Sequence, residues 1–71
     1  MNTMDIEIKT EYIKLGQLLK LATILTNGSD FKFFIENNLI TRNNEKLIER
    51  GKKIYKGDTI IINTETTINV L

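Results

Sequence analysis

Basic residues are concentrated in one stretch of this sequence, and lysine and arginine at such a density are suited to binding a polyanion. Residues 14–56 hold nine basic residues against four acidic ones, although the formal net charge of the chain is only +1. The segments before and after this stretch carry more acid than base. The pattern indicates a partner rich in phosphate, and a solvated lysine-rich surface is the simpler alternative. The densest part contains Arg42, Lys46, Arg50, Lys52, Lys53 and Lys56.

The two kinds of basic side chain would bind phosphate differently. The planar guanidinium of Arg50 matches two phosphate oxygens, whereas a lysine acts as a point charge. Lys52 and Lys53 alternate on an expected strand, so only one of them shares a surface with Arg50 unless the preceding turn re-aims them. Lys20 and Lys32 lie on the outer sides of two expected helices. Contacts of this kind recognise backbone and shape, and they carry little information about base sequence.

Catalysis and metal binding have little support in the composition. The chain has no histidine and no cysteine, so the commonest general base, thiolate ligands and disulfides are absent. Acid pairs such as Asp30 and Glu36 could in principle transfer protons, but we expect solvated caps and charge partners. Gly51 and Gly57 lack the lysine-serine ending of a phosphate loop and are expected in turns. We therefore predict no enzymatic activity, no metal and no cofactor.

The length and composition favour one small cytoplasmic domain. A chain of 71 residues is expected to form a single domain over residues 1–71 with a small core. A small domain without disulfides fits the cytoplasm better than secretion. No apolar run approaches the ~20 residues of a membrane span. The first residues have neither a basic start nor an apolar stretch, so we expect no signal peptide.

The first half of the chain predicts a strand and two helices. Residues 5–9 alternate as in a strand with one buried face. Residues 15–25 change to a helical period, and Asn27-Gly28 is suited to end that helix. Ser29 is suited to cap the second helix. The expected apolar faces are Leu15, Leu18, Leu19, Ala22 and Leu25 in the first helix and Phe31, Phe34 and Ile35 in the second.

From residue 39 onward the pattern is that of β-structure. Asn43-Asn44 is suited to a tight turn because asparagine accepts a positive φ. Residues 66–71 are expected to pair with the N-terminal strand. The whole order predicts an α+β fold with both helices on one face of a small sheet. The expected strands are residues 39–42, 45–49, 52–55, 59–63 and 66–71.

Two aromatic residues have two possible roles each. Phe33 lies off the inner face of the second helix and is either an exposed contact or part of a second packing surface. Tyr55 lies beside the basic residues, and either packs at the edge of the sheet or contacts a ligand with its polar tip.

Four segments together match the pattern of a known family. They are residues 15–20 (LGQLLK), Gly28-Ser29 before a lysine-bearing helix, Asn43-Asn44-Glu45, and residues 50–58 (RGKKIYKGD). Over residues 6–63 the chain resembles the RNA-binding domain named after ribosomal protein S-four, and more closely its stand-alone YaaA-type members. The last segment is the most specific part of this resemblance.

The resemblance implies a two-helix hairpin packed on a small, mainly antiparallel sheet, which is the alpha-L RNA-binding motif. It also implies that the partner is structured RNA, ribosomal RNA in particular, that the role lies in ribosome assembly, and that there is no cofactor. By position in the motif, the residues expected to face RNA are Lys20, Ser29, Lys32, Asn43, Arg50, Lys52 and Lys53.

Three residues depart from the family pattern. Asn44 stands where glycine is usual, and Glu49 stands where a basic residue is expected. Arg42 replaces an apolar strand residue, so either it extends to the surface along its apolar stem or the register differs here.

Two rival classes remain beside RNA binding. A protein-interaction module would use the same basic residues to bind an acidic partner, and salt dependence of binding to RNA and to protein would separate the two. Gly57-Asp58 before an isoleucine-rich strand also resembles ubiquitin-like sulfur carriers. Those need a terminal Gly-Gly, whereas this sequence ends Asn69-Val70-Leu71. The prediction is therefore a small cytoplasmic RNA-binding protein.

Overall fold

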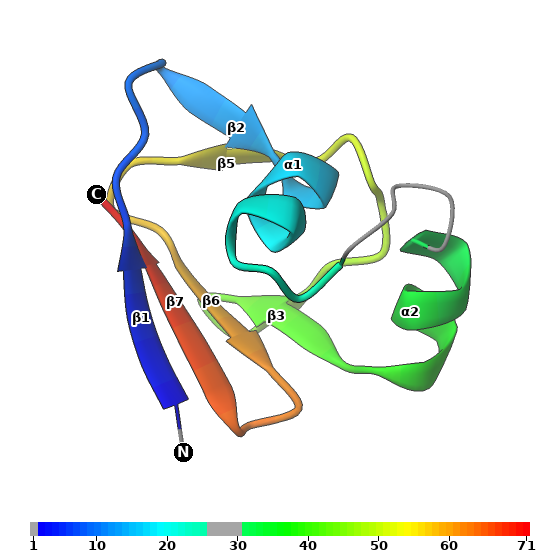
Figure 1. The fold of residues 1–71 in the computed structure, drawn as a ribbon. Coiled ribbons are helices and arrows are strands. Elements are labelled where there is room, and N and C mark those ends of the chain that lie inside the picture. The colour runs from blue at the N-terminus through cyan, green and yellow to red at the C-terminus, as the bar shows by residue number, and fades with distance from the viewer. Residues whose placement is uncertain (1, 26–30) are drawn as a thin grey trace.

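The strands of the protein form two sheets (Figure 1). The computed structural model describes residues 2–25 and 31–71. The larger sheet has the strand order β1-β7-β6-β3-β4, and the smaller one pairs β2 with β5. The strands are β1 (Asn2–Ile6), β2 (Tyr12–Lys14), β3 (Ile40–Arg42), β4 (Glu45–Lys46), β5 (Lys53–Tyr55), β6 (Thr59–Ile62) and β7 (Thr66–Val70).

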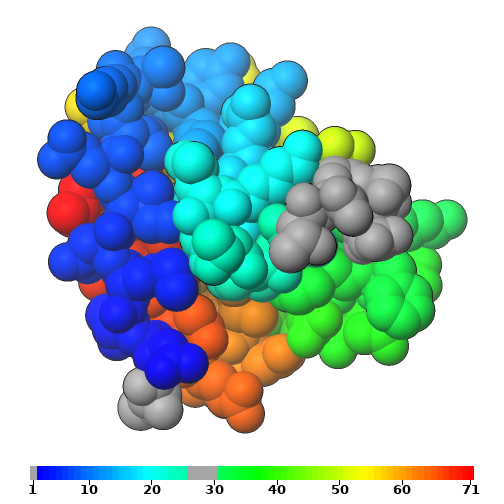
Figure 2. Space-filling view, in the orientation of Figure 1, coloured from blue at the N-terminus to red at the C-terminus, as the bar shows by residue number. Residues whose placement is uncertain are grey.

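Two helices accompany these sheets. They are α1 (Leu15–Leu21) and α2 (Phe31–Asn37). Figure 1 shows α1 between the two sheets and α2 beyond the β3 side of the larger one. In the space-filling view, the N-terminal segment, α1 and α2 cover most of the visible face, and the β6–β7 hairpin emerges at its lower edge (Figure 2). The predicted α+β class and the mainly antiparallel sheet are confirmed.

The two ends of the chain meet in the larger sheet. Strand β1 runs parallel to β7, with Asn2 opposite Thr66, and the other strand pairs are antiparallel. The expected pairing of the C-terminal and N-terminal strands is therefore confirmed. The first strand begins and ends three residues earlier than expected, and Ile8 therefore lies beyond its end. There the Ile8 N–H donates to the Leu71 carbonyl at 3.1 Å.

Two neighbouring residues with positive φ lie in the turn of each hairpin of the larger sheet, the β3–β4 hairpin and the β6–β7 hairpin. Asn43 and Asn44 have φ of 51° and 73°, and Asn63 and Thr64 have 53° and 58°. Positive φ at both central positions matches the right-handed twist of the flanking strands. The turn predicted at Asn43-Asn44 is confirmed. The return strand is shorter than expected because the chain leaves the sheet after β4 and Leu47 enters the core.

The core lies between α1 and the inner faces of the two sheets. Leu15, Leu18 and Leu19 of α1 are fully buried, as are Ile54 of the smaller sheet and Ile60 of the larger one. The predicted apolar stripe of α1 is therefore correct. On α2, Phe31 is buried, Phe34 is partly buried and Phe33 is 70% exposed, so the exposed alternative for Phe33 holds.

Helix α1 ends at Leu21, four residues before the predicted end. Thr23 has a φ of 58°, its N–H donates to the Lys20 carbonyl, and the Ile24 N–H donates to the Leu19 carbonyl. These two hydrogen bonds define a Schellman motif, which ends a helix with one left-handed residue. The expectation was wrong because Ala22 and Leu25 remain buried after the chain has left the helix. The expected stop at Asn27-Gly28 lies outside the described residues.

Replacing Thr23 with glycine should raise the stability of the protein. A β-branched residue in the left-handed region costs about 1–2 kcal/mol, which glycine avoids. A gain of 1 kcal/mol shifts the melting temperature of such a domain by about 4–8 °C. Thr67→Gly, within β7, is the matched control and should lower the melting temperature. A melting temperature that falls equally in both variants would contradict the strain assigned to Thr23.

Candidate functional site

The start of α1 is attached to the segment that precedes β5. The Leu15 N–H donates to the Lys52 carbonyl at 2.9 Å, and the Gly16 N–H donates to the Arg50 carbonyl at 3.0 Å. Strand β2, directly before α1, pairs with β5 in antiparallel fashion, with Lys14 opposite Lys53. These contacts bring two basic segments together that are far apart in the sequence.

The residues at this junction enclose a pocket of about 370 Å³, which we call the basic pocket. Its cations are Lys14, Lys20 and Arg50, all exposed, and none of the acidic residues that the structure describes lines it. None of the three forms an ion pair with another described residue. Their charge is therefore available to an anion from solution. The full lining is Lys14, Gly16, Gln17, Lys20, Arg50 and Gly51.

Gly16 makes room for the side chain of Arg50. A Cβ on Gly16 would lie 2.8 Å from the Arg50 Cγ and 3.3 Å from its Nε. The first of these distances is shorter than real carbon contacts, so any larger residue at this position must displace Arg50. The side chain of Arg50 thus lies against the first turn of α1, and the backbone of Arg50 accepts a hydrogen bond from the same glycine.

Lys52 and Lys53 line a second pocket of about 310 Å³, which meets the basic pocket at Gly51. Lys52 precedes β5, so the strand alternation that would have separated the two lysines does not apply. The structure therefore brings four of the predicted residues, Lys20, Arg50, Lys52 and Lys53, to two adjoining pockets. The other residues of the second pocket are Arg42, Glu49 and Tyr55.

Arg42 differs from the other basic residues because its charge is occupied within the protein. Its Nη1 donates to the Lys53 carbonyl at 2.9 Å and lies 3.7 Å from Asp58 Oδ2. Its Nη2 lies 3.5 Å from Glu45 Oε1. The side chain of Arg42 is only 18% exposed. Asp58 also accepts the Tyr55 N–H at 2.8 Å, so this carboxylate joins β3 to the turn after β5.

The remaining predicted residues lie elsewhere. Lys32, on α2, and Asn43, in the β3–β4 turn, are exposed, and neither lines the two pockets. Ser29 lies outside the described residues. Lys14 and Gln17 are absent from the sequence-based list, although Lys14, Gln17 and Lys20 follow one another at intervals of three residues, which is a signal for one side of a helix.

Within residues 2–25 and 31–71, no three His, Cys, Asp or Glu side chains gather as metal ligands would. No helix in that part of the chain is long and apolar enough to cross a membrane.

The fold and these pockets define a small α+β domain with a cluster of exposed cations beside its first helix. The model of the S4 domain matches residues 6–71, and the chain belongs to this family. It is 42% identical over 57 residues to the probable ribosome maturation protein RlbA of Bacillus subtilis (strain 168), and the match covers 80% of each chain. The similarity to a stand-alone member of the family is thus confirmed. No solved structure matches the chain.

Arg42→Leu should destabilise the protein. A hydrogen bond from a charged donor contributes about 1.5–3 kcal/mol, and the substitution removes the partner of the Lys53 carbonyl. The contact with Glu45 contributes little because that carboxylate is 64% exposed. Lys46→Leu, on the exposed strand β4, removes the same charge and should change the free energy of unfolding by less than about 0.5 kcal/mol. Urea denaturation of both variants measures the difference, and equal losses would argue against the bracing role of Arg42.

Proposed function

We propose that the protein binds structured RNA, and ribosomal RNA in particular, during ribosome maturation. The observation that carries the proposal is the basic pocket, where Lys14, Lys20 and Arg50 meet without an acidic partner among the described residues. Membership of the S4 domain family and the similarity to a probable ribosome maturation protein support the same function.

The binding would depend on side chains rather than on the helix amides. The first two amides of α1 already donate to the carbonyls of Arg50 and Lys52, so they are not available to a phosphate. Arg50 would bind one phosphate through two parallel hydrogen bonds, and the lysines would add point charges. Gly51 connects the two pockets, so a phosphate backbone can follow the surface from Lys20 to Lys53. This arrangement recognises the shape of the backbone.

The proposal includes the family-motif residues outside these pockets. Lys32 and Asn43 would contact RNA further along the surface. Ser29 is included among the proposed RNA contacts only because of its position in the family motif. We include in the proposal that α1 and α2 act as the two-helix unit of the alpha-L motif. The whole chain would act as one cytoplasmic RNA-binding domain without a cofactor, a metal or catalytic activity.

Charge reversal at the second pocket should weaken RNA binding without unfolding the protein. Lys52→Glu combined with Lys53→Glu removes two phosphate contacts. Each lost contact should lower the slope of log affinity against log salt by about 0.7–0.9. Lys9→Glu with Lys46→Glu is the matched control, because it changes the net charge equally at exposed positions outside both pockets.

The measurement is a salt titration with a structured fragment of ribosomal RNA. Equal losses in the two double variants would show that only net charge matters and would argue against a defined surface. Salt-dependent binding to an acidic protein but not to RNA would replace the proposal with the interaction-module alternative.

Gly16→Ala should weaken RNA binding although it suits the helix. Alanine in place of glycine raises helix stability by about 0.5–1 kcal/mol, but here its Cβ displaces the side chain of Arg50. We expect Gly16→Ala and Arg50→Lys each to lose about tenfold in affinity, since both remove the two-point grip of the guanidinium.

A double-mutant cycle tests whether Gly16 acts through Arg50. Once Arg50 is alanine, adding Gly16→Ala should cost no further affinity. Losses that simply add would mean that Gly16 acts independently of Arg50. Lys46→Ala is the control, because Lys46 is exposed and lines none of the pockets. It should bind as the wild type does.

A further inference from the structure

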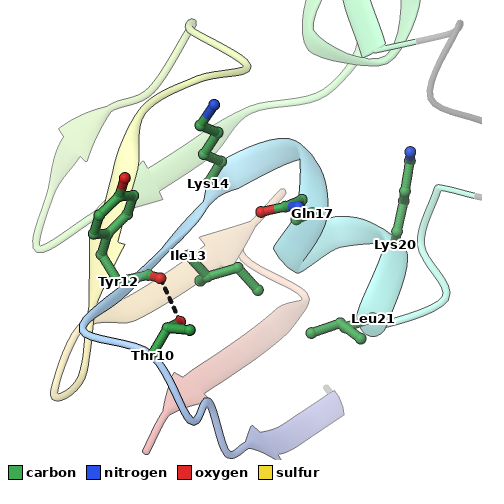
Figure 3. Close-up of a pocket in the computed structure, with 7 residues that line it drawn as sticks. All are labelled: Thr10, Tyr12, Ile13, Lys14, Gln17, Lys20 and Leu21. Carbon is green, nitrogen blue, oxygen red and sulfur yellow. Dashed lines mark hydrogen bonds between the residues drawn. The ribbon is translucent and has the colours of Figure 1, made fainter.

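A third pocket lies beside the basic pocket and is more apolar in its lining. We call it the Tyr12 pocket, and its volume is about 640 Å³. Figure 3 shows Tyr12 on one side and Lys20 and Leu21 on the other, with Ile13 and Gln17 between them. Leu21 is 59% exposed, which leaves a large apolar side chain at the edge of the pocket. The lining consists of Thr10, Tyr12, Ile13, Lys14, Gln17, Lys20 and Leu21.

The Tyr12 pocket and the basic pocket share one border. Lys14, Gln17 and Lys20 line both. A ligand in the Tyr12 pocket would therefore meet apolar and aromatic side chains at one end and cations at the other. Arg50 lines only the basic pocket, so the positive charge increases beyond the border.

The ring of Tyr12 is supported from outside the pocket. The Lys53 Nζ lies 4.9 Å from the centre of the ring, and the Tyr55 ring lies 6.0 Å away at 51°. Neither Lys53 nor Tyr55 lines the pocket. The Thr10 hydroxyl donates to the Tyr12 carbonyl at 2.7 Å, which fixes the backbone at the same point. Tyr12 thus offers a pre-positioned aromatic surface.

The pairing of β2 with β5 also favours an anion near this border. Lys14 lies directly opposite Lys53 in the antiparallel pair. Like charges at directly opposed positions destabilise a sheet, and a bound anion relieves that repulsion. A ligand with a flat apolar part and a phosphate would satisfy both the aromatic end and the cationic border.

We propose that the Tyr12 pocket binds an unpaired nucleobase of the RNA, with the phosphate of that nucleotide at Lys14 and Lys20. The base stacks on Tyr12 and lies over Ile13 and Leu21, and the Gln17 amide can both donate to and accept from its edge. This inference rests on the proposed function and specifies its ligand, namely structured RNA with an unpaired nucleotide beside a helix.

Two RNA stem-loops that differ only in one unpaired adenosine test the inference. Stacking on an aromatic side chain should make the wild type bind the stem with the unpaired base about tenfold more tightly. Tyr12→Leu and Leu21→Ser should abolish this preference and keep the affinity for the fully paired stem. Tyr12→Phe keeps the ring and Leu71→Ser changes a similarly exposed leucine away from the pocket. Both should keep the preference.

A spectroscopic measurement separates stacking from an indirect effect. With 2-aminopurine at the unpaired position, the wild type should quench its fluorescence on binding, and Tyr12→Leu should not. If Tyr12→Leu fails to fold, the test uses Leu21→Ser, whose exposed position tolerates the change, and its preference for the stem with the unpaired base is the deciding measurement.

The outcomes distinguish the two proposals. Salt-dependent binding without a preference for the unpaired base would overturn the Tyr12 pocket and leave the proposed function standing. Equal loss of affinity for both stems in Leu21→Ser would also overturn the pocket. Failure of the wild type to bind either stem would overturn the proposed function and this inference with it.

Discussion

Two hydrogen bonds at the start of α1 determine the arrangement of the rest of the surface. The Leu15 and Gly16 amides donate to the carbonyls of Lys52 and Arg50. A helix begins with amides that lack intrahelical partners, so these bonds satisfy the helix and attach the basic segment to it. Because these amides are occupied, a bound anion would have to contact the side chains around them. The position of the Arg50 side chain against α1 depends on glycine at position 16, where a Cβ would lie 2.8 Å from the Arg50 Cγ.

The two arginines of the chain, Arg42 and Arg50, have opposite roles, and they differ in how far their side chains are buried. Arg42 has two carboxylates and a carbonyl within reach and is largely covered. It stabilises the junction of β3 with β5 and contributes little free charge. Arg50 is exposed and forms no ion pair with any residue that the structure describes. An uncompensated cation is tolerated at the surface because water solvates it, and it remains available to a ligand.

Local patterns predicted much of the fold, and contacts distant in sequence explain the failures. The stripe of α1 and the turn at Asn43-Asn44 follow from side-chain period and backbone preference, which are local. Strand β2 has only three residues and is defined by its pairing with β5, so no local pattern marks it. Because the sequence pattern did not reveal β2, it also did not identify Lys14 as a site residue or predict the Tyr12 pocket, which both depend on this strand. The role of Arg42 was left open because Asp58 and the Lys53 carbonyl reach it only in the folded chain.

If the two proposals hold, the adjoining pockets would contribute two different kinds of binding free energy to RNA. The cations of the basic pocket would act through phosphate charge, which salt screens and which is the same for every sequence. In the proposed complex, Tyr12, Ile13 and Leu21 would act through stacking and apolar burial, which salt affects little and which need an unpaired base. Lys14, Gln17 and Lys20 line both pockets, so the base and the backbone of one nucleotide can bind together. Backbone contacts would supply most of the affinity, and the Tyr12 pocket would fix where along a structured RNA the domain binds.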